Sequence, residues 1–101
     1  MIARLWHGAT PSGRSEEYLR YLRETGLPGY QNVPGNQGVQ ILTRVEGAAT
    51  HFLVVSYWES MEAVARFAGE PVEHAQYYPR DREFLLELEP KVLHYQVAAT
   101  Q

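Results

Sequence analysis

Residues 51–60 read HFLVVSYWES, and this stretch joins an expected strand to an expected helix. Residues 51–58 are rich in β-branched and aromatic side chains, which favour a strand. Ser60 is a residue type that commonly caps a helix N-terminus, and Gly69 is placed to end the helix that follows. Between them, one helical face carries apolar side chains at three- and four-residue spacing, namely Met61, Val64, Ala65, Phe67 and Ala68. The stretch therefore predicts a strand over 51–58 and a helix over 61–68.

Three further stretches have the composition of strands. Residues 39–45 (VQILTRV) precede the first stretch, and the glycine within 46–50 allows a hairpin that makes the two strands antiparallel. Residues 2–7 (IARLWH) predict a strand that ends at Gly8, and residues 91–97 (KVLHYQV) predict the last strand. We therefore expect a sheet of four strands.

The remaining stretches predict helices and a loop. Residues 14–25 have the spacing of an amphipathic helix, with Gly26 as its C-terminal stop. Residues 27–38 (LPGYQNVPGNQG) predict a loop that can include one helical turn. Residues 72–78 predict a further turn or two of helix, which Pro79 ends because it has no amide hydrogen to donate. The resulting order, strand, helix, strand, strand, helix, strand, is the ferredoxin-like βαββαβ pattern of an α+β fold with a four-stranded antiparallel sheet.

The composition limits the size and class of the protein. A chain of 101 residues, 45% of them hydrophobic, suits a single domain over residues 1–101. The formal net charge of −3 comes from interspersed charges and offers no basic surface for nucleic acid. The absence of cysteine excludes a thiolate zinc site and a cysteine nucleophile. No apolar run suits a signal peptide or a membrane span, so we expect a cytoplasmic protein without membrane contact.

Side chains alternate between the two faces of a strand, so the residues of the sheet fall into two sets. One set is a nearly continuous apolar layer that we assign to the face under the helices: Ala3, Leu5, Val39, Ile41, Val45, Leu53, Val55, Tyr57, Leu93, Tyr95 and Val97. The other set mixes aromatic, aliphatic and polar residues: Arg4, Trp6, Gln40, Leu42, Arg44, Phe52, Val54, Ser56, Trp58, Val92, His94 and Gln96. This second face is too apolar for open solvent and too polar for a dry core. We expect it to line a cavity, to pack against a second copy, or both, which predicts a homodimer.

The element order, the YWES turn at 57–60 and the proline- and glycine-containing loop after the first helix together resemble the antibiotic biosynthesis monooxygenase family. The resemblance covers residues 2–97 and implies a dimeric α+β barrel with a cavity in each subunit. For some members it implies oxidation of aromatic polyketides by molecular oxygen without metal or flavin. Other members cleave heme.

Three positions separate this chain from the heme-degrading branch of that family. The branch uses an asparagine on the first strand, a tryptophan on the second helix and a histidine ligand about three turns further on. The matching places here are near Trp6, at Phe67 and near Tyr77, with His74 one turn before Tyr77. Because all three depart from the pattern, the resemblance implies neither the same iron ligation nor the same chemistry. We expect no cofactor, with molecular oxygen as co-substrate, and set heme aside.

Three side chains are candidate proton acceptors. Alternation turns His94 toward the cavity, and an imidazole with an ordinary pKa of about 6.5 can remove a phenolic proton near neutrality. In the segment 74–81 (HAQYYPRD), His74 or Tyr77 could reach the cavity mouth as a proton acceptor or an orienting hydrogen bond. The alternatives are an interior His94 with one hydrogen bond, and a solvated His74 beside a Tyr77 or Tyr78 that packs on the first helix.

Five other side chains are candidate contacts for an aromatic substrate: Arg4, Trp6, Ser56, Trp58 and Phe67. Trp58 could be a flat wall for stacking, or a tryptophan of the core or the dimer interface. Arg4, beside Trp6, could hold a phenolate or carboxylate, or pair with a partner's carboxylate. The four histidines include no i, i+4 pair, so we expect no metal site.

These features favour a cofactor-independent monooxygenase that acts on a small quinol- or anthrone-like aromatic in an apolar cavity. One alternative is a non-catalytic ligand-binding or stress-associated dimer with the same cavity. Another is a heme-binding relative that uses His74 or Tyr77. Dinucleotide, nucleotide triphosphate and hydrolase motifs have no match in the sequence.

Overall fold

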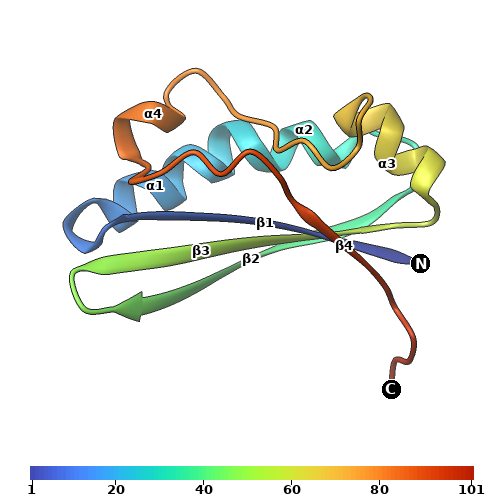
Figure 1. Cartoon of the computed structure of the whole chain (residues 1–101), viewed down its shortest axis with the longest axis horizontal. Helices are drawn as coiled ribbons and strands as arrows, with labels where there is room; N and C mark the ends of the chain where they lie inside the picture. The colour runs from blue at the N-terminus through green and yellow to red at the C-terminus, as the bar shows by residue number, and fades with distance from the viewer.

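The computed structural model describes all residues 1–101 and contains a four-stranded antiparallel sheet with the helices on one face (Figure 1). The strands are β1 (Ile2–Pro11), β2 (Asn36–Glu46), β3 (Ala49–Trp58) and β4 (Leu93–Gln96), in the spatial order β2-β3-β1-β4. The ferredoxin-like α+β prediction is confirmed, and β2 and β3 form the predicted hairpin.

Strand β1 continues through Gly8, where we predicted its end. Gly8 pairs with Phe52 of β3, and the ladder runs on to Pro11. A Cβ atom at Gly8 would lie 2.6 Å from Cη2 of Trp6, which is far closer than real contacts allow. Glycine at this position therefore makes room for the Trp6 ring over the sheet and does not mark a turn.

The first helical region is longer than predicted. It consists of a 3₁₀ turn η1 (Ser12–Arg14), α1 (Ser15–Tyr21), a wider π-helical turn η2 (Leu22–Gly26) and α2 (Leu27–Gln31). Gly26 has helical backbone angles and does not end the helix. Pro28 comes directly after the wider π-helical turn, where the regular ladder of backbone hydrogen bonds is already interrupted. The predicted loop over 27–38 allowed one helical turn, which corresponds to α2; it is wrong at its end, where β2 begins at Asn36.

The second helix is confirmed, whereas the segment after it differs from the prediction. α3 (Met61–Ala68) begins at Ser60, whose hydroxyl accepts a hydrogen bond from Ala63 N–H at 3.2 Å, and it ends at Gly69 with φ of 73°. Residues 72–78 are not helical, because they bond to the segment before β4: Ala75 N–H donates to Pro90 C=O and Val92 N–H to Glu73 C=O. The short helix α4 (Asp81–Phe84) follows Pro79.

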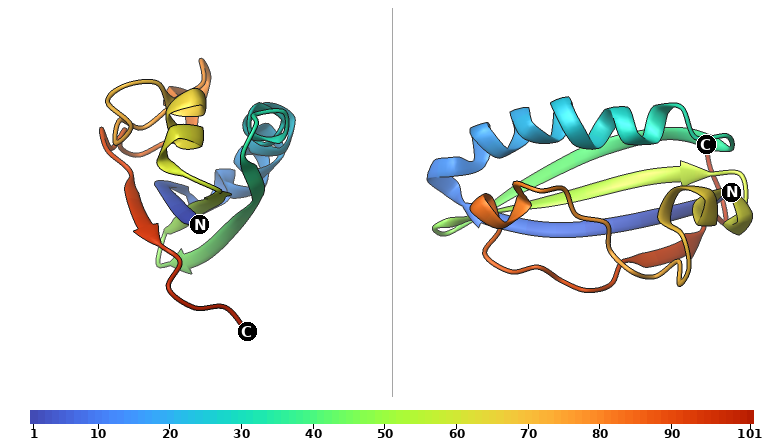
Figure 2. Two further views of the ribbon diagram at one scale, coloured as in Figure 1. Left: turned by 90° about the vertical axis from the view of Figure 1, so that its right-hand side faces the viewer. Right: turned by 90° about the horizontal axis from the view of Figure 1, so that it is seen from above.

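The helices cover the face opposite to the one that we assigned to them on β1, β3 and β4 (Figure 2). Residues that pair across the sheet share a face, and those packed into the core under the helices include Trp6, Val39, Ile41, Phe52, Val54, Trp58 and Val92. We name the other side the open face; it carries Leu5, Gln40, Leu42, Arg44, Leu53, Val55, Tyr57, Leu93 and Tyr95. Bulky aromatic rings fill the deep space under the helices, so the mixed set is the inner one on β1, β3 and β4, whereas on β2 the predicted inner residues Val39 and Ile41 are confirmed.

Candidate functional site

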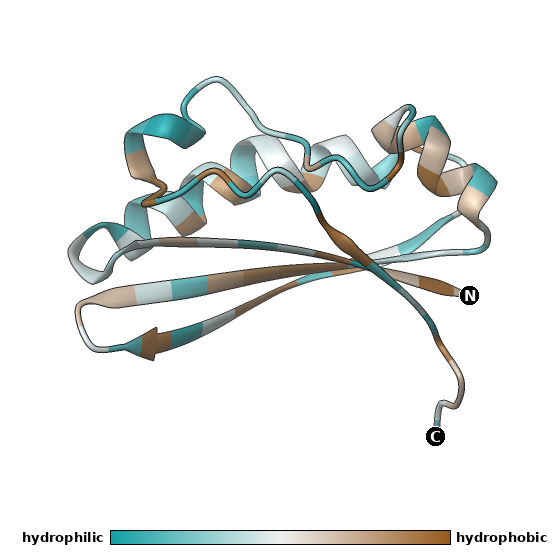
Figure 3. Ribbon diagram, in the orientation of Figure 1, coloured by the Kyte–Doolittle hydropathy of each residue, from teal (hydrophilic) through white to brown (hydrophobic).

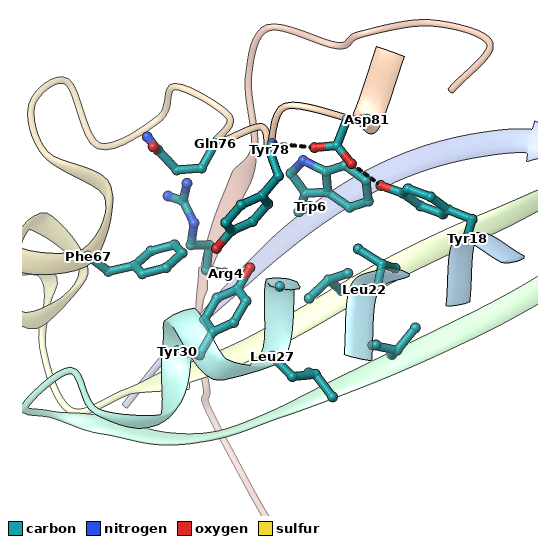
Figure 4. A pocket seen from close by; sticks show the side chains of 13 residues that line it. Arg4, Trp6, Tyr18, Leu22, Leu27, Tyr30, Phe67, Gln76, Tyr78 and Asp81 are labelled. Atoms are coloured by element: carbon teal, nitrogen blue, oxygen red, sulfur yellow. Dashed lines mark hydrogen bonds between the residues drawn. The ribbon is translucent and has the colours of Figure 1, made fainter. Parts of the chain in front are cut away.

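A pocket lies between the helices and the inner face of the sheet, and its wall is mostly hydrophobic and includes five aromatic side chains (Figure 4). The hollow and its open mouth together hold about 460 Å³ including open solvent, but the enclosed cavity is only about 20 Å³, so a bound ring requires side chains of the wall to move apart. We name it the aromatic pocket. It is lined by Arg4, Trp6, Tyr18, Leu22, Gly26, Leu27, Tyr30, Ile41, Val54, Phe67, Gln76, Tyr78 and Asp81.

Stacked rings form the end of the pocket near α3. Tyr30 of α2 and Phe67 of α3 are stacked with their ring centroids 4.5 Å apart. Trp58 lies behind Phe67, with a centroid distance of 5.4 Å, and it is completely buried. Burial raises the pKa of Tyr30 to about 12, so its phenol is neutral at physiological pH. These rings offer a flat apolar surface on which an aromatic ligand can stack.

Arg4 brings a positive charge to this wall. The side chain is only 2% exposed, and its guanidinium lies over the Phe67 ring at 5.6 Å from the centroid. Its nitrogen atoms donate hydrogen bonds to Val72 C=O at 2.7 Å and to His74 C=O at 3.0 Å. Burial lowers the pKa of Arg4, but an arginine stays charged. The partners are neutral groups, so the charge is available to an electron-rich ligand atom.

His94 supports Arg4 from the neighbouring strand. Its Nε2 atom lies 3.0 Å from Arg4 Nη1, and because arginine has only donors, Nε2 accepts. Burial and then the Arg4 charge lower the pKa of His94, which keeps the imidazole neutral near pH 7. His94 does not line the pocket, so its contact with the site runs through Arg4.

Asp81 is a buried carboxyl at the other end of the pocket. Tyr18 O–H donates to its Oδ1 atom at 2.8 Å, and Tyr78 N–H donates to its Oδ2 atom at 2.5 Å. Burial raises the pKa of Asp81, and these two hydrogen bonds offset part of that shift. Helix α4 is hydrophilic over most of its length (Figure 3), yet it buries Asp81 together with Phe84, whereas Arg82 and Glu83 are exposed.

Three of the predicted substrate contacts line the pocket, and two do not. Arg4, Trp6 and Phe67 are part of the wall. Trp58 is a core residue behind it, and its indole N–H donates to Ser56 Oγ at 2.9 Å. Ser56 is likewise buried and is engaged by this bond, so both residues support the pocket without facing it.

The two predicted proton acceptors of segment 74–81 lie outside the pocket wall. The side chain of His74 is exposed, and only its carbonyl contacts Arg4. Tyr77 packs edge-on against Trp6 at a centroid distance of 6.0 Å, and its hydroxyl donates to Glu89 C=O. Burial raises the pKa of Tyr77 to about 12. The neighbouring Gln76 and Tyr78 line the pocket instead.

Several wall residues were missed by sequence reasoning. Tyr18, Leu22, Gly26 and Tyr30 recur at four-residue intervals, which is the signature of one helical stripe. That signal was present in the sequence but was cut at Gly26 by the predicted helix end. For Asp81, whose place depends on a turn after Pro79, no periodic signal exists.

Two of the four histidines come together on the open face. His7 Nε2 lies 2.9 Å from His51 Nδ1, while the outer nitrogen atoms contact Glu89 at 2.5 Å and Glu46 at 3.0 Å. The groups form a chain, not a cluster, and no three His, Asp or Glu side chains converge as a metal site. None of the helices is both long and apolar enough to cross a membrane.

The four-stranded antiparallel sheet with its helices on one face defines a ferredoxin-like α+β domain, with the aromatic pocket between the helices and the sheet. The chain belongs to the antibiotic biosynthesis monooxygenase family, whose family model matches residues 1–76. A search of the curated proteins finds no match.

Solved structures match almost the whole chain. MhuD of Mycobacterium tuberculosis, a heme-degrader with two hemes bound in its active site, has a TM-score of 0.70 and 24% identity, with 100% of this chain and 99% of MhuD covered. A protein from Bacillus cereus assigned as an antibiotic biosynthesis monooxygenase has a TM-score of 0.71 and 16% identity, with 99% and 95% covered. At these identities the likeness establishes the fold.

The comparisons correct our expectation about cofactors. We expected none and set heme aside on the departures near Trp6, Phe67 and Tyr77. Structures of MhuD hold two hemes or, in a variant with a TM-score of 0.67, two manganese protoporphyrins per active site. The exclusion of heme was therefore wrong, because departures at single positions were taken to exclude a ligand that structural neighbours of this chain bind.

Proposed function

We propose that the aromatic pocket binds a planar aromatic ligand and that the protein is an oxygenase acting on it. The observation that carries this proposal is the pocket itself: stacked rings of Tyr30 and Phe67, with the buried charge of Arg4 on one side and the buried carboxyl of Asp81 on the other. Family membership supports the class of reaction. The substrate class is an electron-rich phenol such as a quinol or an anthrone.

The reaction replaces the ring CH₂ group of an anthrone by a carbonyl. In an anthrone, molecular oxygen supplies the new carbonyl oxygen, and its second atom leaves as water with the two hydrogen atoms of the methylene group. Loss of a proton makes the ring electron-rich enough to react with oxygen, and Arg4 stabilises the negative charge that develops. The rings orient the ligand and exclude water. His94 acts by orienting Arg4.

Oxygen uptake and product analysis with a panel of hydroxylated anthrones and quinols test this function. We expect turnover with at least one member, and a reduction of at least tenfold in kcat/KM for Phe67→Ala, because stacking is lost. Arg20→Ala, an exposed change on α1, is the matched control and should leave turnover unchanged. If the protein binds these compounds but none is oxidised, it is a ligand-binding module and not an oxygenase.

Heme is a second candidate ligand, favoured by the hemes in the MhuD structures and by the phenols of the pocket. Tyrosine is one of the residue types that hold heme iron, and Tyr30 or Tyr78 would do so here against the aromatic wall. Bound heme would supply iron-based oxygen chemistry. A titration should give a saturable Soret shift in the wild type that Tyr78→Phe or Tyr30→Phe reduces; an unchanged spectrum at excess heme would remove this candidate.

We also infer that two copies of the chain associate through the open face. Leu42, Leu93 and Tyr95 are 47%, 61% and 56% exposed, although large apolar side chains are normally covered. Leu42 pairs with Leu53, and Leu93 pairs with Leu5, which pairs in turn with Val55. One apolar surface therefore extends across the sheet. A homodimer would cover this surface and leave the aromatic pocket on the far side of each sheet.

A further inference from the structure

The two tryptophans of the inner face differ in whether the indole N–H has a hydrogen-bond partner. The indole N–H of Trp58 donates to Ser56 Oγ at 2.9 Å. The Nε1 atom of Trp6 is equally buried, yet it has no hydrogen-bond partner. Native proteins leave few buried donors unpaired, because the lost hydration is not recovered. Trp6 lines the aromatic pocket and is 7% exposed, so a bound ligand is the natural partner for this donor.

Asp81 lines the same pocket with unused capacity to accept hydrogen bonds. A carboxylate has about four lone-pair sites, and the bonds from Tyr18 and Tyr78 occupy one on each oxygen. Those two bonds also fix the orientation of the carboxyl group. Figure 4 shows the indole nitrogen of Trp6 on the side of the ring toward Asp81. A donor and an acceptor therefore stand at one end of the pocket, apart from Arg4 and Phe67.

We propose that Trp6 and Asp81 together bind a hydroxyl group of the aromatic ligand: the Trp6 indole donates to the hydroxyl oxygen, and the Asp81 carboxylate accepts its hydrogen. The proposal rests on the proposed function of the pocket and names the group by which the ligand is recognised. In the reaction, Asp81 is then the residue that can take the phenolic proton. The bond broken is ligand O–H, the bond formed is carboxyl O–H, and the ligand keeps the electron pair as a phenolate.

The Trp6 indole and the Asp81 carboxylate together favour a hydroxyl group on the ligand over related functional groups. An ether oxygen can accept from Trp6 but offers no hydrogen to Asp81, so the buried carboxylate would stay partly unpaired. A ligand carboxylate at this end would be repelled by Asp81. Burial raises the pKa of Asp81, which makes it a stronger proton acceptor than an exposed aspartate.

A purely structural role for these residues makes a different prediction. Asp81 could serve only to hold the turn at Tyr78 against Tyr18, and Trp6 could be only an apolar wall. In that case, a phenol and its methyl ether would bind equally well, and substitutions would weaken both to the same extent.

Calorimetric titration of the wild-type protein with 1-naphthol and 1-methoxynaphthalene separates the two roles. We expect 1-naphthol to bind at least tenfold more tightly. Trp6→Phe keeps an aromatic ring without the N–H, and Asp81→Asn keeps the shape without the charge. Each should reduce the preference to below threefold while the affinity for the ether changes little. Glu83→Gln, the same type of change on the exposed side of α4, is the control and should keep the preference.

The possible results are distinct. Equal affinity of the wild type for both probes, or equal weakening of both probes in Trp6→Phe, overturns the role of Trp6 and Asp81 while the proposed pocket stands. Failure to bind either probe contradicts the pocket function and this inference together. If Asp81→Asn does not fold, acidification of the wild type replaces it: 1-naphthol affinity should fall as Asp81 is protonated, whereas ether affinity should not.

Discussion

The two faces of the sheet are built from alternate residues of the same strands, yet they differ in a way that polarity alone does not reveal. The inner face buries Arg4, Ser56 and two tryptophans, and the open face exposes Leu93 and Tyr95. Arg4 is tolerated inside because carbonyls of segment 72–74 and His94 accept its hydrogen bonds. The lesson is that partners, not side-chain polarity, decide which face is covered by helices.

The largest effect on stability should come from the buried arginine. Arg4→Met keeps the length of the side chain but leaves Val72 C=O, His74 C=O and the His94 nitrogen without their donor. Loss of charged hydrogen bonds to buried acceptors should lower the free energy of unfolding by about 3 kcal/mol. Urea denaturation, with the midpoint and slope both fitted, measures this.

The matched variant lies on the open face. Arg44→Met removes an arginine whose Nη1 atom lies 3.3 Å from Glu46, in an ion pair that is 64% exposed on both sides. The expected loss is below about 0.5 kcal/mol, because exposed pairs contribute little. Equal losses in the two variants would mean that burial and hydrogen bonding do not distinguish the faces.

The second effect concerns association through the open face. Leu93→Glu places a charge in the proposed dimer interface, on edge strand β4 next to Leu5 of β1. We expect the dimer dissociation constant to rise at least tenfold, or about 1.4 kcal/mol, because the charge would lose its hydration on association. Light scattering over a concentration series measures the shift. A wild-type protein that is monomeric at all concentrations would remove the dimer, although the pocket would be unaffected.

A smaller effect on stability is expected when a side-chain hydrogen-bond acceptor is removed, and it should differ between the two faces of the sheet. Ser56→Ala removes the partner of the buried Trp58 N–H and should cost about 1–2 kcal/mol of unfolding free energy. Gln40→Ala removes the acceptor of the Tyr57 hydroxyl at 3.2 Å on the open face, where water can replace it, and should change the unfolding free energy by less than about 0.5 kcal/mol. Thermal melts of both variants test the difference.

The sequence supplied the order of elements and the alternation along each strand, because these depend on local composition. The sequence did not show which side of the sheet the helices cover. A shift of one residue, or an exchange of the two sides, keeps the alternation along every strand intact. The mixed set of Arg4, Trp6 and Trp58 was predicted to line a cavity, to pack against a second copy, or both, but its position under the helices depends on partners from segment 72–74. Asp81 could not be found, because its burial follows from contacts with Tyr18 and Tyr78 that are distant or irregular in the chain.

The smallest effect is a dependence of stability on pH through His94. Burial and the Arg4 charge lower its pKa in the folded state, whereas an unfolded histidine has a pKa of about 6.5. The unfolded chain therefore binds more protons as the pH falls below about 6.5, and the stabilisation from neutral His94 is lost on acidification toward its lowered folded pKa. Partial exposure and screening should limit the change to below about 1 kcal/mol. His94→Asn can still accept from Arg4 but does not titrate, so the difference in melting temperature between wild type and variant should shrink or reverse from pH 7.5 to pH 5; a constant difference would show that His94 carries its proton equally in both states.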